Sequence, residues 1–598
     1  MIRGLSTCIA IHWVALVMAM AVGLVYASHH FFIPRFIDAQ TEVYHPITRA
    51  DYFDEVLLYA PRAHSVFFDF GIRGDFSLAE YPQSPAYLPM LNPLLLGGLG
   101  KIFGSFKTGI IASDFLFPAA IFFIAYLLFR EIARGISGSL LFSLLFVFSP
   151  KFGISVPPVS TAHLKTLAYT FMPFLNINDP LYFSHFEEPK ITFLFFVLCV
   201  YAIIRAFIRQ GRGNIIFAGI SFGVLFYTYL YDWALVLTAL GIMGIYFLAQ
   251  KDYGRLKIIA SIAGIGFLVS TYYWVNLFML KGLAQSKDII ARLGGEFSHQ
   301  FRFATVWKSY GRALILAGTL WMLLREKVPS AAIVVGALLL SYIVVVNEQM
   351  ITGFNVQPDH WYRGQFLPIA VSIGLICAWL YRRFEPIRIK KYAPLACAVF
   401  IFYFFVGALY SQYAYSRDRA DLFVIPLAYQ QGFDWLNANV PAGSVVGTLS
   451  FNGNLDLQMH TQNHIFMPFG LSTSASEDEL WKRFMIMAQL WNLDTKAFAL
   501  SINQEGGAYY LFGDQYGIHT FDGAFFPYYW RVPDGVLAEK TVVYEKMLEK
   551  KNILTLNYRF DYLFVDRDVF PNWQEPKHLL PSLTNVFDNG RVSIFRFK

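Results

Sequence analysis

The strongest constraint on this sequence is a series of long apolar runs separated by short basic loops. A helix that spans a bilayer needs about 20 consecutive, mostly apolar residues, and several runs approach that length. The composition agrees, because 56% of the residues are hydrophobic and only 15% are charged, whereas soluble domains carry about 25% charged residues. The chain is therefore predicted to be a polytopic α-helical membrane protein.

The apolar runs predict about eleven transmembrane helices. The first, residues 5–27, exceeds the apolar run of about 7–15 residues in a signal peptide, so we expect an uncleaved anchor. The other spans are expected near residues 108–130, 136–150, 190–209, 214–230, 232–249, 256–280, 308–325, 329–347, 365–382 and 393–413. Segment 88–104 is short and rich in Pro and Gly, and we expect a juxtamembrane or re-entrant helix there.

The charges of the loops orient these spans. With this assignment five basic loops lie on one side, at Arg130–Arg134, Arg205–Arg212, Lys251–Lys257, Arg325–Lys327 and Arg382–Lys391. Basic loops mark the cytoplasmic side, so the amino terminus is predicted inside and the carboxyl terminus outside. The net charge of +7 therefore reflects orientation, and we expect no nucleic-acid partner. The expected location is a bacterial inner membrane or an archaeal cell membrane.

The composition changes after residue 413, which predicts two domains. Residues 1–413 form the transmembrane part, with a long first outer loop at 28–107. Residues 414–598 are expected to form an extracytoplasmic α/β domain, in which "FDWLNANVPAGSVVGTLS" predicts a helix, a turn and a strand. "RFDYLFVD" predicts a strand, and the Asn-Gly pair in "NVFDNGRVSIFRFK" predicts a hairpin.

The first outer loop contains a cluster of carboxylates in "RADYFDEVLLYAPRAH", residues 49–64. On a helix, Asp51, Asp54 and Glu55 share one side, because residues three and four apart are neighbours. Such a helix can lie on the membrane surface and present carboxylates to a cavity. A solvated acidic face remains the alternative interpretation.

The order of motifs in this loop resembles a known superfamily. "FDEVLLYAPRAH" is followed by "GDFSLAEYPQSPAYLPMLNPLL" and then by "LGKIFGSF". That order resembles the first outer loop of GT-C membrane glycosyltransferases, which include protein O-mannosyltransferases and aminoarabinose transferases. The resemblance implies a GT-C-like fold and a polyprenyl-phosphate-linked sugar donor. It implies catalytic roles for Asp54 and Glu55, and a substrate-binding role for Glu80 in "EYP". Asp38, which also follows the first span, competes for the catalytic role.

The chemistry of such a transfer defines what else the sequence should supply. A carboxylate base takes a proton from the acceptor hydroxyl, and a single displacement inverts the anomeric centre. The phosphate leaving group needs charge stabilisation by Arg, Lys, His or a divalent metal such as Mg²⁺ or Mn²⁺. The expected partners are the lipid-linked donor, membrane lipid, and a glycan, lipid or protein acceptor.

Polar residues in the other outer loops are candidates for substrate binding. His360 and Arg363, in "QPDHWYRGQ", are candidates for the phosphate, although the same segment could be an interfacial anchor. His185 and Glu188, in "YFSHFEEPKITF", could bind sugar or metal, or Glu188 could be a helix-start charge. Further candidates are Tyr229, Asp232 and Arg292, and for sugar stacking Tyr528, Tyr529 and Trp530.

Two other functions fit a membrane protein with large outer loops. A transporter or flippase of lipid-linked saccharides should show related halves and charges near mid-membrane, and the sequence shows neither. A non-catalytic assembly protein would not need acidic and basic residues concentrated in outer loops. Asp114, near the outer end of an expected span, is a functional candidate by its position, but the sequence assigns it no role.

Overall fold

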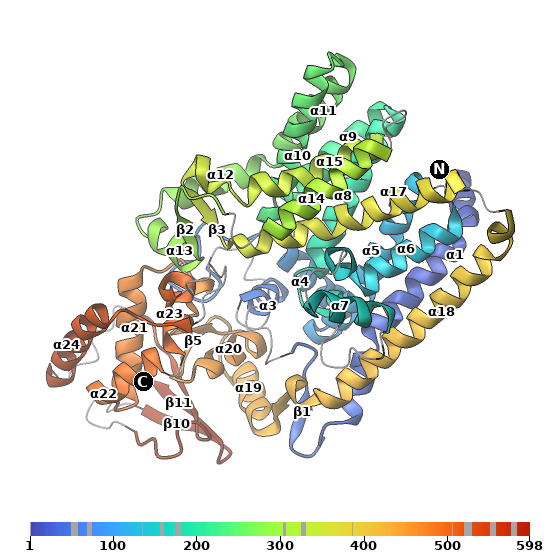
Figure 1. Cartoon of the computed structure of the whole chain (residues 1–598). Helices are drawn as coiled ribbons and strands as arrows, with labels where there is room; N and C mark the ends of the chain where they lie inside the picture. The colour runs from blue at the N-terminus through green and yellow to red at the C-terminus, as the bar shows by residue number, and fades with distance from the viewer. Residues whose placement is uncertain are drawn as a thin grey trace.

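The computed structural model describes most of the chain, namely residues 2–48, 58–68, 75–133, 135–155, 161–172, 174, 181–302, 307–323, 330–384, 387–504, 506–518, 529–550, 558–575 and 583–597. Figure 1 shows a helical part, coloured from blue to yellow, and a mixed carboxyl-terminal part in orange and red beside it. The two parts contact each other along one side of the helical part, and this junction positions the candidate site.

The helical part consists of long apolar helices connected by shorter ones. The long helices are α1 (Ile2–Ala27), α5 (Phe106–Ala133), α8 (Lys190–Arg209), α10 (Leu230–Ala249), α17 (Phe366–Phe384) and α18 (Ile387–Asp418). Intermediate ones are α4 (Leu91–Phe103), α6 (Ile136–Phe148), α7 (Thr161–Phe171), α9 (Arg212–Leu225), α11 (Tyr253–Val269), α12 (Thr271–Lys281), α14 (Trp307–Leu323) and α15 (Ser330–Val345). Short elements include α2 (His29–Phe32), α3 (Ala60–Phe67), α13 (Ser286–Arg292), α16 (Gln349–Thr352) and the 3₁₀ segments η1 (Ile33–Arg35), η3 (Pro150–Ser155), η5 (Tyr182–Ser184) and η6 (Pro358–Gln365).

The prediction of about eleven spans is too high for the described residues. Five helices are long and apolar enough to cross a membrane, or up to seven if each of two bent pairs is one span. Two of the predicted spans form the short helices α6 and α9, of 13 and 14 residues. At 1.5 Å per residue these helices fall short of the roughly 30 Å of a hydrocarbon core.

The carboxyl-terminal part contains a five-stranded mixed sheet, as the α/β prediction requires. Its strand order is β10-β11-β9-β5-β6, with β5 parallel to β6 and β9, and β11 antiparallel to β9 and β10. The strands are β5 (Val445–Gly447), β6 (His464–Ile465), β9 (Tyr562–Asp566), β10 (Leu583–Asp588) and β11 (Val592–Phe597). Helices α19 (Leu427–Asn439), α20 (Phe451–His460), α21 (Glu477–Leu490), α22 (Thr495–Asn503), α23 (Gly507–Phe512) and α24 (Asp534–Lys550) accompany it, with η7 (Ala420–Phe423), η8 (Gly470–Ser472) and η9 (Gly513–Tyr516).

The predicted local elements of this part are confirmed. Strands β10 and β11 form the expected hairpin, and Gly590 in its turn has φ +87°, a conformation that glycine adopts without steric cost. The predicted helix, turn and strand are α19 and β5, and the predicted strand of "RFDYLFVD" is β9. Tyr562–Asp566 is buried at every position, which explains its continuous apolar run.

Three small two-stranded sheets complete the strand content of the described chain. Strand β1 (Glu42–Tyr44), in the segment that follows α1, pairs antiparallel with β4 (Val424–Pro426), just after α18. The other pairs are β2 (Gly295–Phe297) with β3 (Phe354–Val356), and β7 (Gly517–Ile518) with β8 (Tyr529–Trp530). The segment between α1 and α5 and the carboxyl-terminal part also share one apolar core, in which Leu58 and Leu96 belong to the same cluster as Trp481. Their relative position is therefore fixed by burial of apolar surface.

Candidate functional site

A cavity of about 1050 Å³ lies at the junction of the two parts. Its lining from the helical part includes Tyr59, Lys151, Tyr182, His185, Glu188, Gln357, His360, Tyr362 and Arg363. Its lining from the carboxyl-terminal part includes Phe451, Phe469, Phe484, Tyr509, Tyr510, Asp514, Trp530 and Phe570. This volume is at the upper end of the range for ligand pockets.

One corner of the cavity joins three segments that are distant in the sequence. Arg363 Nη1 donates to Glu188 Oε2 at 3.1 Å and lies 3.4 Å from the hydroxyl oxygen of Tyr229. The Tyr229 hydroxyl is also 2.7 Å from Nδ1 of His360. His360 and Arg363 point the same way because side chains three residues apart eclipse on a 3₁₀ helix, here η6.

The Tyr229 hydroxyl organises this corner as a neutral group. Burial and the nearby Glu188 carboxylate raise the pKa of the Tyr229 phenol well above its ordinary value. Its oxygen can therefore accept from Arg363 while its hydrogen is directed to His360 Nδ1. Asp232 lies behind the corner, buried in the first turn of α10. Among the described residues its Oδ2 atom has no hydrogen-bond partner.

The structure thus brings together most of the predicted binding residues. His185, Glu188, His360 and Arg363 all line the cavity, and Tyr229 contacts two of them. Asp54 and Glu55, like Asp51, lie outside the described residues. Tyr59, four residues after Glu55, lines the same cavity.

Three other predicted residues do not line the cavity. Glu80 pairs with Arg483 at 3.1 Å in the carboxyl-terminal part. Arg292 is buried and donates to the carbonyl oxygens of Thr473 and Ala475 at 3.0 and 2.8 Å. Asp38 is exposed and closes a turn, where its Oδ1 accepts from the Gln40 amide at 3.0 Å. These contacts give each of the three side chains a local structural role.

Apart from Trp530, the wall that the carboxyl-terminal part contributes to the cavity was not predicted from the sequence. It is aromatic, and it surrounds one carboxylate, Asp514. Asp514 accepts from Trp530 Nε1 at 3.0 Å and from Gln357 Nε2 at 3.2 Å, so it links the two parts of the molecule. The rings of Tyr509 and Trp530 are 4.5 Å apart. Of the three aromatics predicted to stack on sugar, Trp530 lines the cavity, Tyr529 is exposed and Tyr528 lies outside the described residues.

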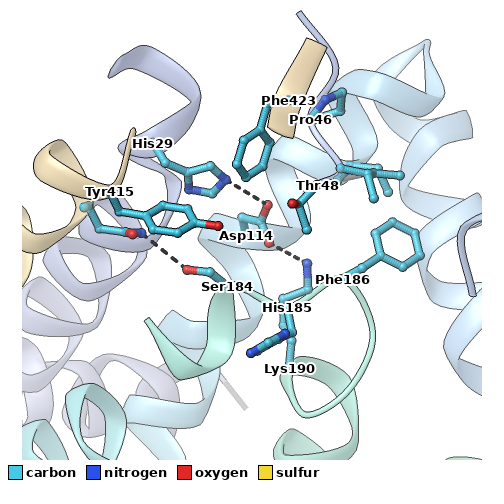
Figure 2. Close-up of a pocket in the computed structure, with 13 residues that line it drawn as sticks. His29, Pro46, Thr48, Asp114, Ser184, His185, Phe186, Lys190, Tyr415 and Phe423 are labelled. Atoms are coloured by element: carbon cyan, nitrogen blue, oxygen red, sulfur yellow. Dashed lines mark hydrogen bonds and ion pairs between the residues drawn. The ribbon is translucent and has the colours of Figure 1, made fainter. Parts of the chain in front are cut away.

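A second, buried cluster of charged and imidazole side chains adjoins the large cavity, and Figure 2 shows three of its members, His29, Asp114 and Lys190. Asp114 of α5 accepts from Lys190 Nζ at 2.5 Å through Oδ1, and its Oδ2 lies 2.8 Å from His30 Nε2 and 4.0 Å from His29 Nε2. His185 lines both this small pocket and the large cavity. The only signal in the sequence was the carboxylate of Asp114 inside an apolar run.

Comparisons with family models and with curated proteins return no match. Along nearly its whole length the chain is similar to solved structures of ArnT from Cupriavidus metallidurans. The structure bound to undecaprenyl phosphate aligns with 98% of this chain and 97% of that chain, at 11% identity and a TM-score of 0.49. The apo structure aligns with 98% of both chains, at 12% identity and a TM-score of 0.46. Both TM-scores are below 0.5.

Proposed function

We propose that this chain is a GT-C-type membrane glycosyltransferase that moves a sugar from a polyprenyl-phosphate donor to an acceptor on the extracytoplasmic face. The observation that carries the proposal is the convergence of Arg363, His360 and Glu188 in one large cavity at the junction of the two parts. The site combines a cation with imidazole and carboxylate groups and lies next to long apolar helices. Such a site suits a lipid-linked phosphate. The motif order of the first outer loop supports the same reading.

The phosphate of the donor would lie against Arg363. The contacts of its guanidinium with Glu188 and with Tyr229 both use Nη1, and a guanidinium has five N–H donors in a planar fork. A phosphate can therefore be bound by the remaining donors in a bidentate manner. In the structure Glu188 neutralises this charge, so donor binding replaces or shares an existing ion pair.

The transfer then needs one base and one leaving group. The acceptor hydroxyl oxygen attacks the anomeric carbon, and the bond from that carbon to the phosphate oxygen breaks with its electron pair. The proton of the hydroxyl passes to the carboxylate of Asp54, which the motif order favours over Asp38. Glu55 would position the acceptor. Arg363 and His360 stabilise the charge that develops on the phosphate. A Mg²⁺ or Mn²⁺ ion at the phosphate stays a prediction, and these steps do not require it.

The aromatic wall suits the acceptor. Tyr509 and Trp530 offer flat apolar faces, and Asp514 between them and Gln357 offers carboxylate oxygens for hydroxyl groups. The carboxyl-terminal part would therefore contribute to acceptor binding, while the helical part binds the donor phosphate.

The test uses the full-length protein in lipid nanodiscs with a labelled polyprenyl-phosphate sugar and candidate acceptors. We expect Asp54→Asn to abolish transfer. We expect Asp38→Asn to retain transfer, because Asp38 closes an exposed turn away from the cavity. Thermal unfolding of both variants shows whether each one folds.

The opposite pattern, with loss in Asp38→Asn alone, would move the base to Asp38. Absence of transfer with every donor, together with movement of the intact lipid-linked sugar across a vesicle membrane, would show a transporter instead.

A further inference from the structure

The cluster around Asp114 has the composition and spacing of a metal site. His29, His30 and Asp114 each offer one ligand atom, these atoms lie within 4.8 Å of one another, and all three side chains are buried. Ligands about 2.1 Å from a tetrahedral Zn²⁺ ion lie roughly 3.4 Å apart. The two distances to Asp114 Oδ2, 2.8 and 4.0 Å, bracket that separation. Shifts of roughly 0.6 Å in each imidazole position would bring both nitrogen–oxygen distances to that value.

Each imidazole also has a partner on its other nitrogen. Nδ1 of His29 is 2.8 Å from the carbonyl oxygen of Tyr26, to which it can only donate, so Nε2 of His29 carries the lone pair. Nδ1 of His30 is hydrogen-bonded to the Tyr44 hydroxyl. Histidine ligands of metals almost always have such an outer partner, which fixes the ring orientation and tautomer.

Space for a further ligand is present beside two of these residues, His29 and Asp114. A small pocket of about 20 Å³ is lined by His29, Asp114 and Lys190. A cavity needs roughly 10–15 Å³ of this kind of volume to contain one water. The pocket can therefore supply a water as the fourth ligand of a tetrahedral ion.

Lys190 does not occupy the position between the imidazoles. Its Nζ atom binds Oδ1 of Asp114 and, at 2.9 Å, the Ser113 hydroxyl, whereas both imidazoles face Oδ2. The ammonium therefore acts on the outer oxygen of the carboxylate. A water bound to Zn²⁺ loses its proton with a pKa near 7, and the resulting hydroxide offsets part of the added positive charge.

We propose that His29, His30 and Asp114 bind one divalent transition-metal ion, such as Zn²⁺, by two imidazole nitrogens and one carboxylate oxygen. The ion joins α2, which follows the bend after α1, to α5. Through the Asp114–Lys190 pair it also fixes the start of α8, directly after His185 and Glu188 of the large cavity. This role is structural, and it does not depend on the proposed glycosyl transfer.

The test measures metal directly. The full-length protein is purified in detergent with an affinity tag that contains no histidine, dialysed, and analysed by inductively coupled plasma mass spectrometry. We expect about one transition-metal ion per chain. We expect loss of that ion in His29→Gln and in His30→Gln. The matched control is His12→Gln, because His12 lies on the preceding helix α1 and contacts Tyr126 instead. It should retain the ion.

A second measurement, on wild-type protein, tests the proposal even where the histidine variants fail to fold. Wild-type protein stripped with a chelator is titrated with Zn²⁺ alone, and binding should raise its unfolding temperature. Replacement by Co²⁺ should give the visible absorption of a four-coordinate ion. Wild-type protein with no bound metal and no response to Zn²⁺ would overturn the proposal. Equal loss of metal in His12→Gln would overturn it as well.

Discussion

The molecule contains two neighbouring buried ion pairs that differ in their access to solvent. The side chains of Arg363 and Glu188 are 24% and 7% exposed, and their pair opens into the large cavity. The side chains of Lys190 and Asp114 are 0% and 4% exposed, beside a pocket with room for about one water. The open pair can exchange its carboxylate for an anionic ligand. The closed pair cannot, so its charges must stay together.

One segment of the chain contributes side chains to both pairs. Within six residues, His185 lines both pockets, Glu187 is buried, Glu188 faces the large cavity and Lys190 reaches Asp114. A structural cluster therefore fixes the residues that line the cavity. Substitutions in the closed pair should mainly lower the stability of the fold. Substitutions in the open pair should mainly weaken ligand binding.

The largest effect is expected from breaking the closed pair. In protein stripped of metal with a chelator, Lys190→Met leaves the Asp114 carboxylate buried without its cation, and removing one partner of a buried pair costs about 3–5 kcal/mol. Unfolding of this metal-free protein by denaturant in detergent measures the loss. The double variant Lys190→Met/Asp114→Asn should recover much of it, because no uncompensated charge remains.

Lys151→Met is the matched control for this experiment. Lys151 is exposed, and its ammonium lies 5.4 Å from the centre of the Tyr182 ring, so its removal should cost less than about 1 kcal/mol. Equal losses of unfolding free energy in Lys190→Met and Lys151→Met would contradict the distinction between a closed and an open pair.

The second effect concerns the open pair. Arg363→Gln removes the cation proposed to bind the donor phosphate, and we expect kcat/KM for transfer to fall by roughly 10²–10³-fold. The cost in stability should be smaller than for Lys190→Met, because Glu188 faces the cavity and can be solvated. Steady-state kinetics with a labelled donor, together with unfolding measurements, separate the two effects.

Arg363→Lys serves as the conservative comparison for this variant. A lysine keeps the charge but not the bidentate fork, so its activity should lie between wild type and Arg363→Gln. Wild-type kinetics in Arg363→Gln would remove Arg363 from the donor site.

The comparison also shows what the sequence could predict. His360 and Arg363 were predicted from their own segment, because three-residue spacing aligns them whether the helix is α or 3₁₀. Glu188 and Tyr229 were predicted from polar residues at the ends of apolar runs. The hairpin β10–β11 followed from an Asn-Gly turn between strand-like runs. These are local signals, each contained within a few residues.

The rest depends on contacts between distant segments. Asp114 and His30 are 84 residues apart, and no spacing rule connects them. The aromatic wall likewise forms only when the carboxyl-terminal part packs on the helical part. For the described residues the number of spans was overestimated, because apolarity predicts burial in protein and burial in lipid equally well. Helices such as α9 are short and have several residues buried inside the protein.

The smallest expected effect is a dependence of stability on pH, and it arises in the segment that connects the two ion pairs. Burial raises the pKa of the Glu187 carboxyl to about 8, against the opposing effect of the Arg62 guanidinium. The folded protein therefore binds a proton at Glu187 that the unfolded chain has lost above its ordinary pKa of 4.5. This contribution to stability is fully present below pH 4.5 and is lost as the pH rises toward 8. Within that window we expect a loss of roughly 1.4 kcal/mol per pH unit.

Glu187→Gln keeps the shape and the contact with Asn92 but does not titrate. The free energies of unfolding of the two proteins, measured from pH 5.5 to 7.5, should therefore differ most at high pH, and the wild-type value should approach that of the variant as the pH falls. A constant difference in the free energy of unfolding between the two proteins over this range would show that Glu187 is already charged, and that its carboxylate is as accessible to solvent as that of Glu188.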